Sequence, residues 1–199
     1  MSEYIFLGDS ITDCDHLCDP DGLGDGYVRF ISEYVSPNHT TLNLGYDGFT
    51  IAALNRLWNR RSASLNPSHI SILIGINDIG VIKNTGRPLD LAFTEFKSSY
   101  ETLICNIRSR FDCPITLIEP FIFPYPQEFL NWYPEVQRMS QTIQQLAQEH
   151  NLQFLPTWNA LLEYCKIEGF HNYTTDGIHL TEKGHRLLSH LWLSNKKGR

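Results

Sequence analysis

The chain has 199 residues, of which 42% are apolar and 19% charged, and its formal net charge at pH 7 is −6. This composition suits one globular domain over residues 1–199, and it excludes a disordered, collagen-like or low-complexity protein. The negative charge lies at the start of the chain, because residues 1–28 carry seven acidic side chains and no Lys or Arg. A chain of this charge is not expected to bind nucleic acid.

Short apolar segments alternate with longer segments of helical periodicity, which predicts strand–helix repeats around a parallel sheet. We expect five strands, at residues 4–7, 40–44, 69–74, 115–118 and 153–155. The predicted fold class is therefore α/β, with three α/β/α layers and a doubly wound five-stranded parallel sheet. Ligands of such sheets bind beyond the carboxyl ends of the strands.

Two apolar stripes predict long helices between the later strands. The first stripe repeats at steps of four and three and consists of Leu89, Phe93, Phe96, Tyr100, Leu103, Ile107 and Phe111. The second consists of Val136, Met139, Ile143 and Leu146, and follows Pro134, which a first helical turn tolerates. Thr181 is placed to cap a last helix that runs to about Leu193. A frayed tail would follow, with Lys196, Lys197 and Arg199.

No signal peptide or membrane-spanning run is visible, and five cysteines without a pattern suggest reduced thiols. We therefore expect a soluble, cytoplasmic protein. Cys14, His16 and Cys18 could together hold a soft metal, but no second ligand pair accompanies them. The prediction is that the protein uses no metal and no cofactor.

Ser10 directly follows the first predicted strand, where a hydroxyl can stand at the sheet edge and act as a nucleophile. Ser10 could instead only cap a helix, because Gly-Asp-Ser is also a common turn sequence. A nucleophilic serine needs a base, and the base needs an acceptor that orients it.

Eight histidines compete for the role of base. His179 is the best candidate, because Asp176 stands three residues earlier and its carboxylate can reach an imidazole nitrogen. His16, in the Asp-rich loop, ranks second. Structural or solvated positions are expected for His39 in a turn, His69 at a strand start, His150 at a helix end, and His185 and His190 within the last helix.

Acyl transfer also needs hydrogen-bond donors aimed at the developing oxyanion. Asn77 follows the third predicted strand and can offer its side-chain amide, while Gly48 can offer an unobstructed backbone N–H. The backbone N–H of Ser10 would be the third donor. Each of these residues could also be only a turn or helix-start residue.

Four segments, residues 8–12, 43–48, 75–78 and 176–179, resemble in order and spacing the sequence blocks of the SGNH (GDSL) hydrolases. The resemblance implies the family's flavodoxin-like fold, with Ser10 as nucleophile, His179 as base and acid, and Asp176 as its orienting partner. It implies an oxyanion hole of Ser10, Gly48 and Asn77. Gly45 is an alternative to Gly48. Gly48 is favoured because the family's donor usually falls five residues after the asparagine that corresponds to Asn43.

Residues 8–14 and 23–28 further resemble the intracellular branch that includes acetyl-xylooligosaccharide esterases. This resemblance implies a carboxylic ester hydrolase that removes short acyl groups, O-acetyl above all, from carbohydrates through an acyl-enzyme on Ser10. The expected partner is a small-molecule ester, not nucleic acid or a membrane. A homo-oligomer is compatible with the sequence.

Two alternatives to this function stay open. One is a broad-specificity esterase, thioesterase or lysophospholipase for longer acyl chains, and the aromatic loop of residues 121–133 could line an acyl tunnel or stack on sugars. The other is a non-catalytic carbohydrate-binding module. The Asp-rich loop of residues 13–25 is either a solvated surface or a pocket border whose negative field would disfavour anionic substrates.

Overall fold

The structure, a computed structural model, describes residues 2–35 and 39–197. In this part of the chain, five strands form one parallel sheet in the order β2-β1-β3-β4-β5. The strands are β1 (Ser2–Gly8), β2 (His39–Gly45), β3 (Pro67–Leu73), β4 (Ile115–Ile118) and β5 (Gln153–Leu155). All five predicted strands and the predicted fold class are confirmed. The strand order reverses direction between β1 and β3, and ligands of doubly wound sheets bind at such a point.

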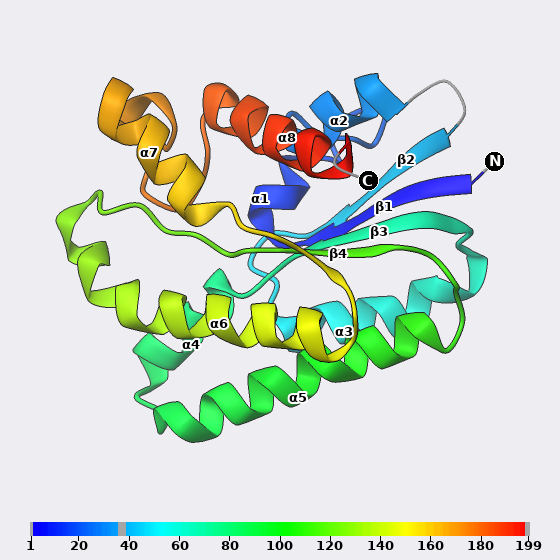
Figure 1. Ribbon diagram of the computed structural model, residues 1–199, viewed down its shortest axis with the longest axis horizontal. Helices are drawn as coiled ribbons and strands as arrows, with labels where there is room; N and C mark the ends of the chain where they lie inside the picture. The colour runs from blue at the N-terminus through cyan, green and yellow to red at the C-terminus, as the bar shows by residue number, and fades with distance from the viewer. Residues whose placement is uncertain (1, 36–38, 198–199) are drawn as a thin grey trace.

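Helices cover both faces of the sheet (Figure 1). One face carries α2 (Tyr27–Val35), α7 (Trp158–Glu168) and α8 (Glu182–Lys197). The other face carries α3 (Ile51–Arg61), α4 (Ile76–Thr85), α5 (Leu89–Arg108) and α6 (Tyr133–Glu149). Shorter elements are α1 (Ser10–Asp13) and the 3₁₀ turns η1 (Ser62–Ser64), η2 (Gln127–Trp132) and η3 (Phe170–Asn172). None of the helices described is long and apolar enough to cross a bilayer.

The two apolar stripes pack into the core, but the prediction was wrong at both ends of the first stripe. Every residue of the second stripe, on α6, is buried. Leu89 is 43% exposed because it is the first residue of α5, ahead of the packed turns. Phe111 lies beyond the end of α5 at Arg108 and packs edge-on against Trp58 from outside the helix.

The last helix begins as predicted and ends later than predicted. The Thr181 hydroxyl accepts a hydrogen bond from the Gly184 N–H at 3.2 Å, which is a helix cap. Because α8 runs to Lys197, the backbone of Lys196 and Lys197 is helical where we expected a frayed tail. Arg199 lies outside the described residues.

The central strands are buried on both faces, and they end level with one another. Ile5, Phe6 and Leu7 of β1 are fully buried, as a parallel sheet between helical layers requires. In the strand register, Gly8 of β1 pairs with Gly45 of β2 and with Leu73 of β3. The segments that follow these three strands therefore meet at one edge of the sheet.

Candidate active site

Ser10, His179 and Asp176 form a continuous hydrogen-bonded chain. The Ser10 Oγ lies 2.9 Å from His179 Nε2, and His179 Nδ1 lies 2.6 Å from Asp176 Oδ2. A carboxylate at Nδ1 holds the imidazole proton there, so Nε2 is left to accept the proton of the serine hydroxyl. The structure thus brings together the three residues that the sequence pointed to, although 169 positions separate Ser10 from His179.

The turn that presents Ser10 is fixed by its neighbours. Asp9 is the N-cap of α1, and its carboxylate accepts a hydrogen bond from the Ile11 N–H at 3.1 Å. Ser10 is the first residue of α1, so the alternative that Ser10 only caps this helix is wrong. Gly8 cannot carry a side chain, because a β-carbon there would lie 2.7 Å from the Leu73 carbonyl oxygen.

The turn that carries the imidazole is held by hydrogen bonds from within. Asp176 Oδ1 accepts from the backbone N–H groups of Ile178 and His179 at 2.9 and 2.8 Å. Burial raises the pKa of Asp176, but the hydrogen bonds from the His179 side chain and from the backbone lower it by more. The pKa of Asp176 is therefore below its ordinary value, and the group is a carboxylate at neutral pH.

Two of the predicted oxyanion donors, Gly48 and Asn77, come from the loop after β2 and from the first turn of α4, which follows β3. Gly48 has a left-handed φ of +68° and nothing packs where its side chain would be. Asp13 of α1 accepts the Asp47 N–H at 2.9 Å, which ties the loop before Gly48 to the helix of Ser10. Asn77 donates one amide hydrogen to the Phe49 carbonyl at 3.0 Å and keeps a second donor.

Gly45, the alternative oxyanion donor, has its backbone N–H engaged elsewhere. It donates to Asn43 Oδ1 at 2.9 Å. The Asn43 amide in turn donates to the carbonyls of Thr12 at 2.7 Å and Leu23 at 2.8 Å. In the sequence, Asn43 served only to locate Gly48 by its spacing. The hydrogen bonds by which Asn43 holds the Ser10 turn were not predicted. The available signal was a polar side chain near the end of a buried strand.

Two buried carboxyl groups, those of Asp9 and Asp78, stabilise the segments that carry the site. Burial raises the pKa of Asp9 and the pKa of Asp78 to about 7 in each case. Asp78 accepts a hydrogen bond from the Ile51 N–H at 3.1 Å and so joins the start of α4 to the start of α3. These groups hold the elements that carry Ser10 and Asn77.

Comparison with known proteins decides the family. The sequence model of the GDSL-like lipase/acylhydrolase family matches residues 6–187. The chain belongs to this family. The acetylxylan esterase of Geobacillus stearothermophilus is 29% identical to this GDSL hydrolase, over 96% of this chain and 92% of its own length. An isoamyl acetate-hydrolyzing esterase 1 homolog of Bos taurus is 24% identical, over 94% of this chain and 79% of its own length.

Solved structures share the fold. A protein of Parabacteroides merdae superimposes with a TM-score of 0.88 at 24% identity, covering 98% of this chain and 95% of its own. Axe2, the acetylxylan esterase of G. stearothermophilus, gives a TM-score of 0.84 at 24% identity, covering 98% and 93%. Axe2 variants described as catalytic mutants replace a serine, an aspartate or a histidine by alanine, the last two three positions apart. With its family and fold both shown, this GDSL hydrolase is a carboxylic ester hydrolase.

A cavity of about 260 Å³ opens on the hydrogen-bonded pair of Ser10 and His179. Ser10 and His179 line it together with Asp13, Asp15 and Asp47. The first part of the Asp-rich loop therefore borders the site. The later aspartates, Asp19, Asp21 and Asp25, lie 2.5, 3.5 and 3.9 Å from the guanidinium of Arg29.

Two other histidines considered in the sequence, His16 and His39, have partners of their own. His16 is buried and bonds Asp13 at 2.6 Å, so it does not act on Ser10. His39 begins β2 instead of lying in a turn, and its Nδ1 lies 2.9 Å from the Ser2 hydroxyl. Over the described part of the chain, no three His, Cys, Asp or Glu side chains gather as metal ligands.

Cys14 pairs with His185 close to Ser10, at 3.3 Å between Sγ and Nε2. His185 Nδ1 accepts from the Tyr27 N–H at 3.3 Å, so its proton is on Nε2 and points to the sulfur. Burial lowers the pKa of His185 to about 4 and raises the pKa of Cys14 to about 12. Both groups are neutral at pH 7, and His185 is not a competing base.

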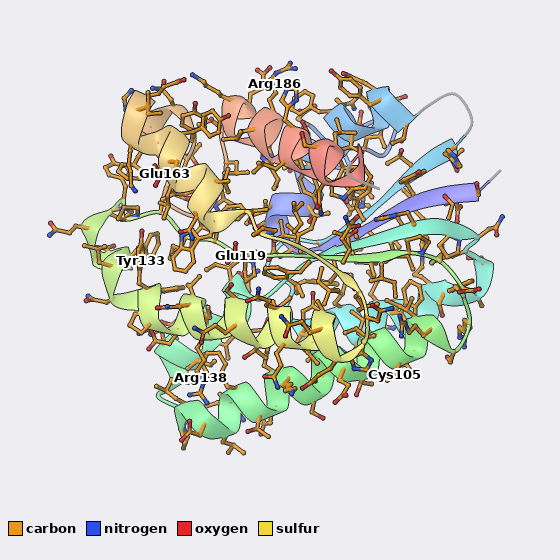
Figure 2. The ribbon with its side chains drawn as sticks, viewed as in Figure 1. Cys105, Glu119, Tyr133, Arg138, Glu163 and Arg186 are labelled. Carbon is orange, nitrogen blue, oxygen red and sulfur yellow. The ribbon has the colours of Figure 1, made fainter. Side chains whose placement is uncertain are left out.

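The aromatic loop divides into two parts. Phe121, Ile122 and Phe123 are fully buried and belong to the core, so this part of the loop cannot line a pocket. The second part contacts the turn of Asp176 and His179, because a β-carbon on Gly177 would collide with the Tyr125 carbonyl oxygen. Tyr133, labelled in Figure 2 at the start of α6, packs edge-on against Trp158 with ring centroids 5.0 Å apart.

Proposed function

We propose that the protein is a serine esterase that hydrolyses short acyl esters of carbohydrates, O-acetyl esters above all, through an acyl-enzyme on Ser10. The observation that carries the proposal is the chain of hydrogen bonds from Asp176 through His179 to Ser10 at the carboxyl edge of the sheet. The catalytic mutants of Axe2 support it, because this chain has the same three residue types with Asp and His at the same spacing.

In the first half of the reaction, Ser10 Oγ attacks the acyl carbonyl carbon while His179 Nε2 takes the hydroxyl proton. The carbonyl π electrons move to oxygen, and the negative charge meets the N–H groups of Ser10, Gly48 and the Asn77 side chain. The C–O bond to the alcohol then breaks, and the alcohol leaves with the proton from His179. Asp176 stays ionised throughout and stabilises the imidazolium.

In the second half, a water molecule attacks the carbonyl carbon of the acyl-enzyme and gives a proton to His179. The bond to Ser10 Oγ breaks, and the imidazolium returns its proton to the serine oxygen. The products are the free acid and the regenerated enzyme. Every proton is carried by groups of the chain and by water.

The polarity of the cavity supports a neutral, hydroxyl-rich substrate. Asp13, Asp15 and Asp47 line it, and carboxylates accept hydrogen bonds from sugar hydroxyls. The same charges repel an anionic substrate and favour departure of an acetate product. The name of the relative from G. stearothermophilus, acetylxylan esterase, points to the same class of substrate.

The test is a series of p-nitrophenyl esters from acetate to octanoate, followed by peracetylated xylo-oligosaccharides. We expect kcat/KM to fall steeply beyond acetate and acetate to be released from the sugars. Ser10→Ala should abolish turnover while the circular dichroism spectrum is unchanged. Activity that rises toward octanoate would favour a lysophospholipase or thioesterase, and undiminished turnover by Ser10→Ala would refute the serine mechanism.

A further inference from the structure

An aromatic pair in η2 lies between the two halves of the catalytic machinery. Phe129 and Trp132 are both half-buried, and their rings meet edge to face with centroids 5.2 Å apart. The sequence singled out the loop that contains them as rich in aromatic residues, and the proposed mechanism gives neither ring a task. Their contacts indicate one.

Phe129 packs on the turn of the catalytic base. A β-carbon placed on Gly177 would lie 2.7 Å from Phe129 Cδ2, so the ring covers the backbone between Asp176 and His179. The Phe123 N–H donates to the Gly177 carbonyl at 2.9 Å on the same turn. One end of the aromatic pair is therefore fixed to the segment that positions the imidazole.

Trp132 packs on the helix of the oxyanion donor. A β-carbon on Gly80 of α4 would lie 3.6 Å from the Trp132 ring, which is ordinary contact distance. Gly80 stands three residues after Asn77, so the two share a face of the helix. The indole ring therefore lies against α4 at ordinary packing distance, and an alanine at position 80 would also fit beneath it.

The segment that carries the pair is anchored on both sides. Lys83 of α4 donates to the Asn131 carbonyl at 2.7 Å and pairs with Glu135 of α6 at 2.6 Å. Tyr133 packs on Trp158 of α7. These contacts hold the two rings in place, which a wall of a binding site requires.

The pair lies on the opposite side of Ser10 from the acidic cavity. The strand order is β2-β1-β3-β4, and Ser10 follows β1. Asp47 follows β2, on one side of β1. The aromatic pair follows β4 and packs against α4, the helix after β3, on the other side of β1. A bound ester has two substituents on its carbonyl carbon, and they point to opposite sides. The hydroxyl-bearing alcohol matches the carboxylates, and the apolar acyl group matches the rings.

We propose that Phe129 and Trp132 form the wall of the acyl site and that Trp132, seated over Gly80, sets the length of acyl group that the enzyme accepts. The proposal rests on the proposed esterase function. It assigns specificity to a residue outside the catalytic chain and the oxyanion donors.

The experiment compares kcat/KM for p-nitrophenyl acetate and p-nitrophenyl hexanoate in the wild type, Trp132→Ala and Trp132→Phe. Leu130→Ala is the matched control, because Leu130 lies in the same 3₁₀ turn and is 44% exposed. We expect Trp132→Ala to raise the hexanoate-to-acetate ratio at least about tenfold, the scale on which pocket shape discriminates methylene groups. Trp132→Phe should give a smaller rise, and Leu130→Ala none.

A ratio that stays at the wild-type value in both Trp132 variants would overturn the proposal. A purely structural role would lower both rates together and leave the ratio unchanged. If Trp132→Ala does not fold, the ratio in Trp132→Phe decides the matter. Because the ratio is measured within each variant, it is separate from the proposed function, whose own failure would appear as undiminished turnover in Ser10→Ala.

Discussion

Opposing effects act on the carboxyl group of Asp176, and their balance sets its role. Burial raises its pKa, while the His179 side chain and two backbone N–H groups lower the pKa by more. The net lowering keeps the charge on the group that faces His179 Nδ1 at 2.6 Å. In the proposed mechanism, Asp176 therefore fixes the tautomer of the neutral imidazole and supplies the counter-charge of the imidazolium that forms during acyl transfer.

Asn77 provides the test of the oxyanion hole at the scale of one residue. We expect Asn77→Ala to lower kcat for p-nitrophenyl acetate on the order of a hundredfold or more, as the loss of one preorganised donor does. The measurement is steady-state kinetics together with thermal melting, because Asn77 also holds the Phe49 carbonyl. Asn131→Ala, a change at an exposed position, is the control. Loss of only a few-fold in Asn77→Ala would remove Asn77 from the oxyanion hole.

Residues that carry chemistry were easier to predict than residues that shape the site. Ser10, Asp176 and His179 have side chains whose chemistry is recognisable at a strand end or at short spacing. Phe129 and Trp132 act through contacts with Gly177 and Gly80, which lie about 50 residues away in opposite directions along the chain. Such contacts depend on how the loop after β4 folds back, and no local pattern encodes that path.

At the scale of helices and strands, burial was predictable and element ends were not. The strands were recognised because a parallel sheet covered on both faces needs continuous apolar runs. The stripe on α5 indicated the correct face, but it included Leu89 and Phe111, which lie at or beyond the helix ends. Apolar spacing reports the face that packs, whereas a helix end depends on capping and on the path of the next segment.

The junction of α3 and α4 makes a prediction about stability. Burial raises the pKa of Asp78 from 3.8 to about 7, so the folded state binds this proton more tightly than the unfolded state. The contribution of Asp78 to stability therefore falls as the pH rises from about 4 to 7, because ionisation of the buried group costs free energy in the folded state. Asp78→Asn removes that cost and can still accept the hydrogen bond from Ile51.

The measurement is the free energy of urea unfolding at pH 4 and at pH 8. We expect Asp78→Asn to match the wild type near pH 4 and to exceed it at pH 8, by up to about 4 kcal/mol from a shift of about three pKa units. Asp112→Asn, at an exposed loop position, is the control and should give no such difference. An Asp78→Asn protein that is equally destabilised at both pH values would contradict a raised pKa at this carboxyl.

At the scale of the whole molecule, the net negative charge lies in one N-terminal segment, and part of that segment borders Ser10 and His179. Residues 1–28 carry seven acidic side chains and no base, while the rest of the chain holds 15 acidic and 16 basic residues. The acidic side chains of this segment have two different environments. Asp19, Asp21 and Asp25 pair with Arg29. Asp13 and Asp15 border the cavity. The sequence showed where the charge lies along the chain but not which aspartates face the nucleophile.

This division predicts how salt affects substrate choice. The field of Asp13, Asp15 and Asp47 should favour a neutral ester, such as p-nitrophenyl acetate, over the anionic p-nitrophenyl hemisuccinate. Raising the ionic strength from about 0.01 M to about 1 M shortens the Debye length from about 30 Å to about 3 Å, so the ratio of the two kcat/KM values should fall.

Asp15→Asn should lower the same ratio at low salt, because Asp15 lines the cavity, is exposed and has no ion pair among the described residues. Asp21→Asn should leave it unchanged, because Asp21 lies beside Arg29 and outside the cavity lining. A ratio that responds neither to salt nor to Asp15→Asn would mean that the acidic loop is only solvated surface. The proposed preference for neutral sugar esters would then have to come from the shape of the site alone, and the aspartates beside Ser10 would have no part in choosing the substrate.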